Sequence, residues 1–80
     1  MTKVVFDTNV LISAILSSKG ASFELLHLAA KGKLIGYTSK TIMLEFKEIV
    51  QRDFQVPLEK AEQMVGIYLQ FLKLVEPDLK

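Results

Sequence analysis

The sequence lacks cysteine and tryptophan, has a single histidine, and contains no long hydrophobic run. Without cysteine, neither a disulfide nor a thiolate metal site can stabilise the chain. Charged residues interrupt every apolar stretch before it approaches the roughly 18 residues that a membrane span needs. No small-residue cleavage site follows the short apolar run at the N-terminus, so a secretory signal is not expected. These absences predict a soluble, cytoplasmic protein.

An excess of charge of either sign is also missing. The 10 Lys and Arg residues against 9 Asp and Glu residues give a net charge of +1, so charge alone does not indicate nucleic-acid binding. By contrast, 50% of the residues are hydrophobic and the mean hydropathy is +0.31. That is high for a chain of 80 residues, whose surface is large relative to its volume. Two interpretations follow: the chain is part of a larger domain, or it buries apolar surface in an oligomer.

The first half of the chain alternates between strand-like and helix-like segments. Residues 3–6 are a short β-branched and aromatic run, which is typical of a strand buried on both faces. Asp7 or Thr8 can then cap a helix that extends to about Leu16. A turn is expected at residues 17–20 and a second helix at residues 21–30. Gly32 follows that helix and suits the left-handed conformation that ends a helix.

The alternation continues in the second half. Residues 34–37 predict a second strand, and Thr38 or Ser39 can cap a third helix. The apolar stripe of that helix consists of Ile42, Met43, Phe46, Ile49 and Val50. Pro57 fits the start of a fourth helix. The apolar face of the fourth helix is predicted to hold Leu58, Ala61, Val65, Tyr68 and Leu72.

The order of these elements predicts the fold class. A third strand is expected to begin at residues 74–75, so the order is strand, helix, helix, strand, helix, helix, strand. This order is that of an α/β protein built around a parallel sheet. Because the third strand begins just before the chain stops, we expect the 80 residues to be one incomplete domain.

Asp7 is the first candidate for a functional residue. It follows a strand, and ligands of open parallel sheets bind outside the carboxyl ends of the strands. An aspartate in this place can also cap the next helix by accepting a hydrogen bond from a backbone N–H group. Both interpretations stay open on spacing alone.

Glu45 is the second candidate, because it lies just off the apolar stripe of the third helix and can lean over the same end of the sheet. Glu48 is about 60° further round, and we expect it to be solvated or paired with Arg52. Two carboxylates converging from a strand end and a helix are what Mg²⁺ needs, since it takes oxygen ligands and is usually held by one or two carboxylates. The residues alone therefore indicate metal-assisted phosphate chemistry as one interpretation and ordinary structural carboxylates as the other.

Two stretches resemble a known family. VVFDTNVLISAILS at residues 4–17 and SKTIMLEFKEIVQ at residues 39–51 resemble the N-terminal half of a PIN domain. The similarity is greatest to the bacterial and archaeal PIN proteins of toxin–antitoxin pairs, and it covers nearly all of the 80 residues. It implies a three-layer α/β/α sandwich with a central parallel sheet, and residues 1–80 as a single PIN-like domain or its N-terminal half.

The resemblance also implies an activity and a site. Many PIN domains are Mg²⁺- or Mn²⁺-dependent ribonucleases, so we expect hydrolysis of RNA phosphodiester bonds, an antitoxin protein as a partner and a homo-oligomer. Asp7 and Glu45 match the first two acidic residues of the family site and are expected to be the catalytic metal ligands. Asn9 and Thr8 match positions that support the first ligand. The remaining acidic residues of the family come later than this chain extends, and Asp78 is not assigned to that role. The 80 residues alone therefore carry one half of the family site, and the resemblance leaves open whether they are active or inactive.

Two other functions remain open. Haloacid-dehalogenase-type phosphatases also begin with an apolar strand and an aspartate, but they carry a second aspartate where this chain has Asn9, which cannot transfer a proton. Alternatively, Asp7 only caps a helix, and the chain is a protein-interaction module. In that case Mg²⁺ or Mn²⁺ should leave Asp7 and Glu45 unchanged.

The other polar and aromatic residues have simpler roles available. Phosphate groups of RNA need only flexible positive charge, and four lysines are candidates for it, although each can equally be an ordinary surface residue. These candidates are Lys19, Lys31, Lys33 and Lys40. Tyr37 is expected to pack in the core or at the rim of the sheet, or to touch a base, and His27 to be structural or partly exposed. Met43 and Met64 are expected in the core.

Overall fold

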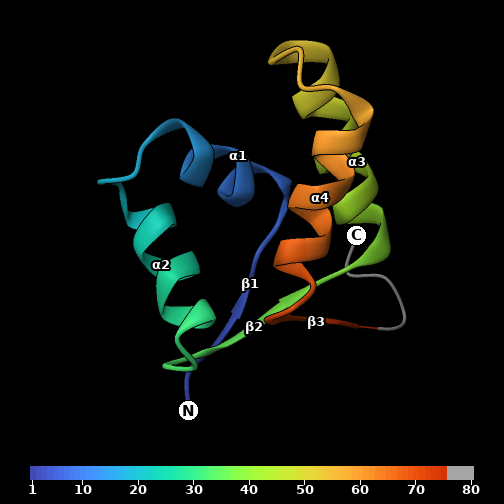
Figure 1. Ribbon diagram of the computed structural model, residues 1–80. Helices are drawn as coiled ribbons and strands as arrows, with labels where there is room; N and C mark the ends of the chain where they lie inside the picture. Colours follow the sequence, from blue (N-terminus) through green and yellow to red (C-terminus); the bar gives the residue numbers. More distant parts are fainter. Residues whose placement is uncertain (76–80) are drawn as a thin grey trace.

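The computed structural model describes residues 1–75, which form a three-stranded sheet and four helices (Figure 1). The strands are β1 (Lys3–Val5), β2 (Ile35–Thr38) and β3 (Leu72–Leu74). The helices are α1 (Thr8–Leu16), α2 (Ala21–Ala30), α3 (Lys40–Asp53) and α4 (Leu58–Tyr68). The predicted order of elements is therefore confirmed. Within these residues, no helix is long and apolar enough to cross a membrane.

The sheet is entirely parallel, with β2 between β1 and β3. Gly36 in the middle of β2 is in register with Val4 on one side and with Leu72 on the other. The expected α/β class with a parallel sheet is thus correct. Both crossovers advance in the same direction across the sheet, and right-handed crossovers of this kind place their helices on one side. Figure 1 shows the four helices on that side.

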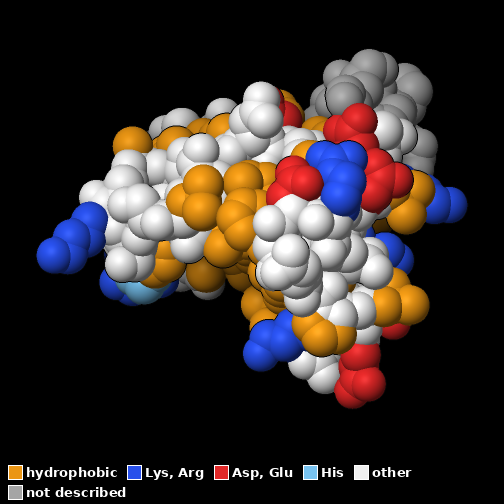
Figure 2. Space-filling view, turned by 90° about the horizontal axis from the view of Figure 1, so that it is seen from above, with side chains coloured by type: hydrophobic (Ala, Val, Ile, Leu, Met, Phe, Trp, Pro, Cys, Tyr) orange, Lys and Arg blue, Asp and Glu red, His pale blue; other side chains and the backbone are white. Residues whose placement is uncertain are grey.

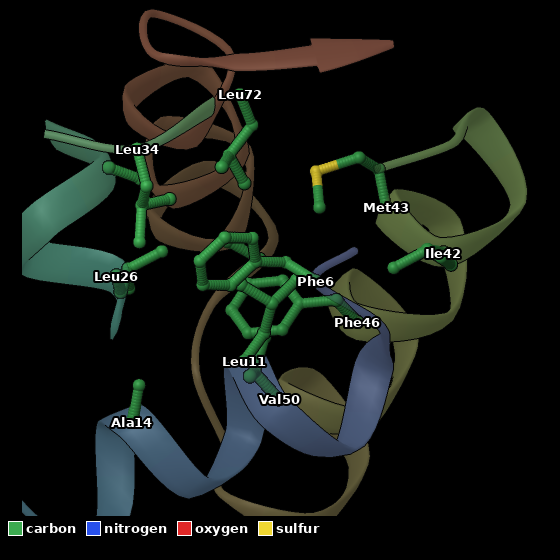
Figure 3. Packing of buried hydrophobic residues seen from close by; sticks show 12 residues of the cluster. Phe6, Leu11, Ala14, Leu26, Leu34, Ile42, Met43, Phe46, Val50 and Leu72 are labelled. Atoms are coloured by element: carbon green, nitrogen blue, oxygen red, sulfur yellow. The ribbon is translucent and has the colours of Figure 1, made fainter. Parts of the chain in front are cut away.

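The core lies between the helices and the covered face of the sheet. Phe6 is fully buried, whereas its neighbour Val5 is 50% exposed, because successive side chains point to opposite faces of a sheet. Figure 3 shows Phe6 and Leu72 from the sheet meeting Leu11 and Phe46 from the helices in one cluster. The other face of the sheet, which carries Val5, has no helix from residues 1–75 against it.

Gly36 is required by this packing. A Cβ atom at this position would lie 2.5 Å from Cδ2 of Leu72 and 2.9 Å from Cε1 of Phe6. Both neighbours are buried side chains, so neither can easily move away. The absence of a side chain in the central strand therefore allows the strands on either side to fill the core.

Local signals in the sequence set several boundaries correctly. The Ser39 hydroxyl accepts a hydrogen bond from the N–H of Ile42 at 3.1 Å and caps α3. Gly32 has a φ of 76° after α2, as its left-handed role predicts. Pro57 occupies the residue before the first turn of α4. Met43 is buried and Met64 packs against the core, as expected.

Three details of the prediction are wrong. Leu72 belongs to β3 rather than to the face of α4, because α4 ends at Tyr68 and β3 begins two residues earlier than expected. Leu58 is 53% exposed, since the first turn of α4 extends beyond the core. The second strand is shifted by one residue to 35–38, because Thr38 continues the ladder before Ser39 caps α3.

Candidate active site

Asp7 lies at the carboxyl end of β1, where the chain turns into α1. The Phe6 N–H donates to the Tyr37 carbonyl at 2.8 Å, which continues the pairing of β1 with β2 up to this point. The Asp7 Oδ1 atom accepts a hydrogen bond from the Val10 N–H at 3.0 Å, so Asp7 caps α1. The capping interpretation is therefore confirmed. In residues 1–75, Oδ2 of Asp7 has no hydrogen-bond partner, and the side chain is exposed.

Glu45 reaches the same place from α3. The Thr8 hydroxyl donates a hydrogen bond to Glu45 Oε1 at 3.0 Å, across 37 residues of sequence. This contact is partly buried and joins the start of α1 to the middle of α3. It holds the Glu45 carboxylate beside the residue that follows Asp7. Glu45 is therefore held close to the start of α1, which Asp7 caps.

A cleft of about 380 Å³ separates the start of α1 from α3. The expected site residues Asp7, Thr8, Asn9 and Glu45 all line it. The remaining lining residues come from α3 and are Ile42, Glu48, Ile49 and Arg52. Figure 2, which views the molecule from above, shows acidic and basic side chains grouped beside a hydrophobic patch.

Arg52 was not predicted to belong to this site. Its Nε atom donates to Asp53 Oδ1 at 2.9 Å, and a second guanidinium nitrogen donates to Asp53 Oδ2 at 3.2 Å. The hydrogen bond with Asp53 and the charge of Asp53 raise the pKa of Arg52, and the charge of Glu48 adds to this effect. The same hydrogen bond lowers the pKa of Asp53. Glu48 is exposed to solvent, which is one of the two roles predicted for it. In the other predicted role it pairs with Arg52, but the hydrogen-bond partner of Arg52 is Asp53.

The candidate lysines do not line the cleft. All four are exposed. Lys40 begins α3 directly after the carboxyl end of β2, so it lies at the same edge of the sheet as Asp7. Lys33 precedes β2 and lies at the opposite edge, and Lys19 is in the turn between α1 and α2. Lys40 is thus the best placed of the candidates. Lys31, like Lys33, lies between α2 and β2.

The two aromatic candidates lie outside the cleft as well. Tyr37 is half-buried in β2, the central strand of the sheet, so its side chain is partly packed. His27 is exposed on α2, where its ring stacks on Phe23 with centroids 6.1 Å apart. The expectation of a partly exposed, structural histidine agrees with this position.

The donor atoms in the cleft suit a hard divalent cation. They include the carboxylate oxygens of Asp7 and Glu45, which line the same cleft as the Asn9 amide. Mg²⁺ accepts such a set because it is commonly held by one or two carboxylates together with water and phosphate oxygens. Among residues 1–75, no group of three or more His, Cys, Asp or Glu side chains is placed to hold a metal. Asp7 and Glu45 therefore line the cleft without a third side chain placed to hold a metal with them among the described residues, and Asp78 lies outside them.

The comparisons with known proteins identify the family of the chain. The sequence matches the PIN domain family over residues 3–80. The chain belongs to the PIN domain family. PIN domains are generally nucleases and typically depend on a divalent metal, so the fold is one of nuclease type. The PIN domain family therefore replaces the haloacid dehalogenase interpretation of the sequence.

One relative matches about half of the chain. The PIN domain is 44% identical over 43 residues to an uncharacterized protein of Methanocaldococcus jannaschii, MJ1680. The matched segment covers 54% of this chain but only 28% of the archaeal protein. No solved structure matches this PIN domain.

Proposed function

We propose that this PIN domain is a divalent-metal-dependent endoribonuclease that acts in the cytoplasm as the toxin of a toxin–antitoxin pair. The observation that supports the proposal is the hydrogen bond from Thr8 to Glu45, which holds a second carboxylate beside Asp7 in one cleft. The reaction would be hydrolysis of an RNA phosphodiester bond, and Mg²⁺ or Mn²⁺ would be the cofactor.

Four residues of the cleft have a defined role in this proposal. Asp7 and Glu45 would hold the cation, and Oδ1 of Asp7 also caps α1. Thr8 fixes the orientation of the Glu45 carboxylate by its hydrogen bond. Asn9 offers an amide to the ligands around the site. When bound, a divalent cation neutralises phosphate charge and lowers the pKa of a coordinated water.

The proposal is tested by Asp7→Asn and Glu45→Gln. Each substitution removes a negative charge and keeps the shape of the side chain, and Asn is still a good helix cap. We expect cleavage of a labelled RNA in Mg²⁺ or Mn²⁺ to fall at least about a hundredfold, while circular dichroism shows an unchanged fold. Glu24→Gln, a change of equal charge at an exposed position on α2, is the control. Wild-type rates in Asp7→Asn would exclude this mechanism.

The capping hydrogen bond of Asp7 also supports a second candidate, a protein-interaction module without catalysis. Titration with Mn²⁺, followed by NMR, separates the two functions. A metal site predicts strong paramagnetic broadening of the backbone signals around residues 7–9 and residue 45, with weaker effects on α2. An interaction module predicts no selective broadening at these residues.

The toxin role includes a partner and is tested in cells. Induction of the wild-type protein should arrest growth, and the Asp7→Asn variant should not. Co-expression of a cognate antitoxin protein should restore growth and should co-purify with the PIN domain. Continued growth with abundant, folded wild-type protein would contradict the toxin role while leaving nuclease activity to the cleavage assay.

A further inference from the structure

Arg52 gives the acidic cleft a positive charge at one end. Three carboxylates line the cleft, those of Asp7, Glu45 and Glu48. Among the described residues that line it, Arg52 is the one cation. A cleft with three negative charges repels a polyanion, and a fixed positive charge at its rim offsets that repulsion locally.

Asp53 holds the Arg52 guanidinium by one edge only. The two hydrogen bonds to Asp53 use Nε and one of the two terminal nitrogens. Within residues 1–75, the other terminal nitrogen has no hydrogen-bond partner, and the side chain is 62% exposed. A guanidinium fixed in this manner retains N–H donors in the planar arrangement that matches phosphate oxygens.

Helix α3 sets the distance of the Arg52 guanidinium from the carboxylates of Glu45 and Glu48. Glu45, Glu48 and Arg52 lie on the same side of α3, since all three line one cleft at intervals of three and four residues. Seven residues of helix separate Glu45 from Arg52, which corresponds to about 10 Å along the axis. Arg52 is therefore too far along α3 to contact a phosphate held at the carboxylates. It is placed beside that phosphate.

We propose that Arg52 binds a backbone phosphate of single-stranded RNA next to the phosphate that is cleaved. The proposal rests on the proposed ribonuclease function and adds a second contact point for its substrate. Arg52 then positions the strand along α3, and Asp53 keeps the guanidinium from folding onto Glu48. A contact of this kind strengthens substrate binding but does not act on the reacting bond.

Arg52→Gln tests this contact in two ways. With a short labelled RNA as substrate, we expect the KM of Arg52→Gln to be about tenfold higher than that of the wild-type protein, because one charge-assisted hydrogen-bond contact is lost. The kcat should stay nearly unchanged. Without divalent metal, RNA binding measured by fluorescence anisotropy should depend less on salt. The slope of log Kd against log salt should decrease by about 0.7, the value for one phosphate contact on a single strand. Arg52→Lys should restore the slope.

Lys60→Gln is the matched control, because it removes the same charge from an exposed position on α4 that does not line the cleft. An unchanged salt slope in Arg52→Gln, or a loss of equal size in Lys60→Gln, would overturn the proposal. The two proposals fail separately. Wild-type cleavage that Asp7→Asn abolishes, together with no effect of Arg52→Gln, keeps the nuclease and removes the Arg52 contact. A reduced slope in Arg52→Gln, in a protein that never cleaves RNA, keeps the phosphate contact and removes the nuclease.

Discussion

At the scale of single residues, Asp7 has a structural task that the structure shows and a chemical one that we propose. One carboxylate oxygen caps α1 through the Val10 N–H, and the residue also lines the cleft. Removing the side chain would therefore remove the cap and the proposed metal ligand together. Substitutions that keep the cap are needed to separate the two effects.

Thr8→Val should weaken metal binding without unfolding the protein. Valine has nearly the shape of threonine but cannot donate the hydrogen bond to Glu45 Oε1. Residues that orient a metal ligand are typically worth about 10–100-fold in metal affinity, and we expect a loss in that range. A Mn²⁺ titration monitored by calorimetry measures the change. Thr2→Val, at an exposed position before β1, is the control, and equal affinities of both variants would show that Glu45 needs no support from Thr8.

At the scale of secondary-structure elements, two glycines predict opposite results for the same substitution. In Gly36→Ala the new methyl group would overlap Leu72 and Phe6, and overpacking of this kind costs about 1–3 kcal/mol. Gly66 is exposed in α4 and a Cβ atom there meets nothing within 4 Å, so Gly66→Ala should stabilise the helix by about 0.5–1 kcal/mol. Urea denaturation of both variants gives the two values. A neutral Gly36→Ala would mean that β3 packs less tightly on β2.

The contact of α4 with α3 predicts a loss of stability at alkaline pH. The Tyr68 ring packs edge-on against Phe46 with centroids 5.3 Å apart, and burial raises the pKa of the Tyr68 hydroxyl. The neutral form is thus favoured in the folded state. Its contribution to stability is complete below the unfolded pKa of about 10 and is lost as the pH rises through the folded pKa.

Tyr68→Phe removes the titrating hydroxyl and keeps the ring contact. Denaturation curves at pH 8 and at pH 11 should show a smaller loss of stability in the variant than in the wild-type protein. Tyr37→Phe, at a half-buried tyrosine in β2, provides the comparison. An identical loss in wild type and Tyr68→Phe would assign the alkaline transition to other groups.

The elements also show how far the sequence predicts this fold and its site. Apolar spacing and capping residues predicted α2 at its observed bounds and placed Asp7 and Glu45 correctly beside one cleft. Leu72 was assigned to the wrong element, because a strand of three residues gives too short a pattern to separate it from the end of a helix. Arg52 was missed because an exposed charge at a helix end has the same pattern whether it faces solvent or a cleft. Only the position of α1 against α3 distinguishes the two.

At the scale of the whole molecule, one face of the sheet is open in residues 1–75. Val5 on this face is 50% exposed, although it lies within a parallel strand, and both faces of a parallel sheet are normally covered. We expect this surface to be covered by a second copy of the chain at high concentration. Sedimentation velocity should show an average mass that rises with concentration, and Val5→Lys should reduce it. A wild-type monomer at all concentrations would contradict this expectation.

The hydrogen bond between Thr8 and Glu45 also determines when the site can exist during synthesis. Its partners are 37 residues apart, so it cannot form before the ribosome has added the first turns of α3. A nascent chain that extends only as far as α2 therefore lacks the second carboxylate. On a ribosome adding about 5–20 residues per second, several seconds separate the synthesis of Asp7 from that of Glu45. During that time the proposed metal site has only one of its two carboxylates.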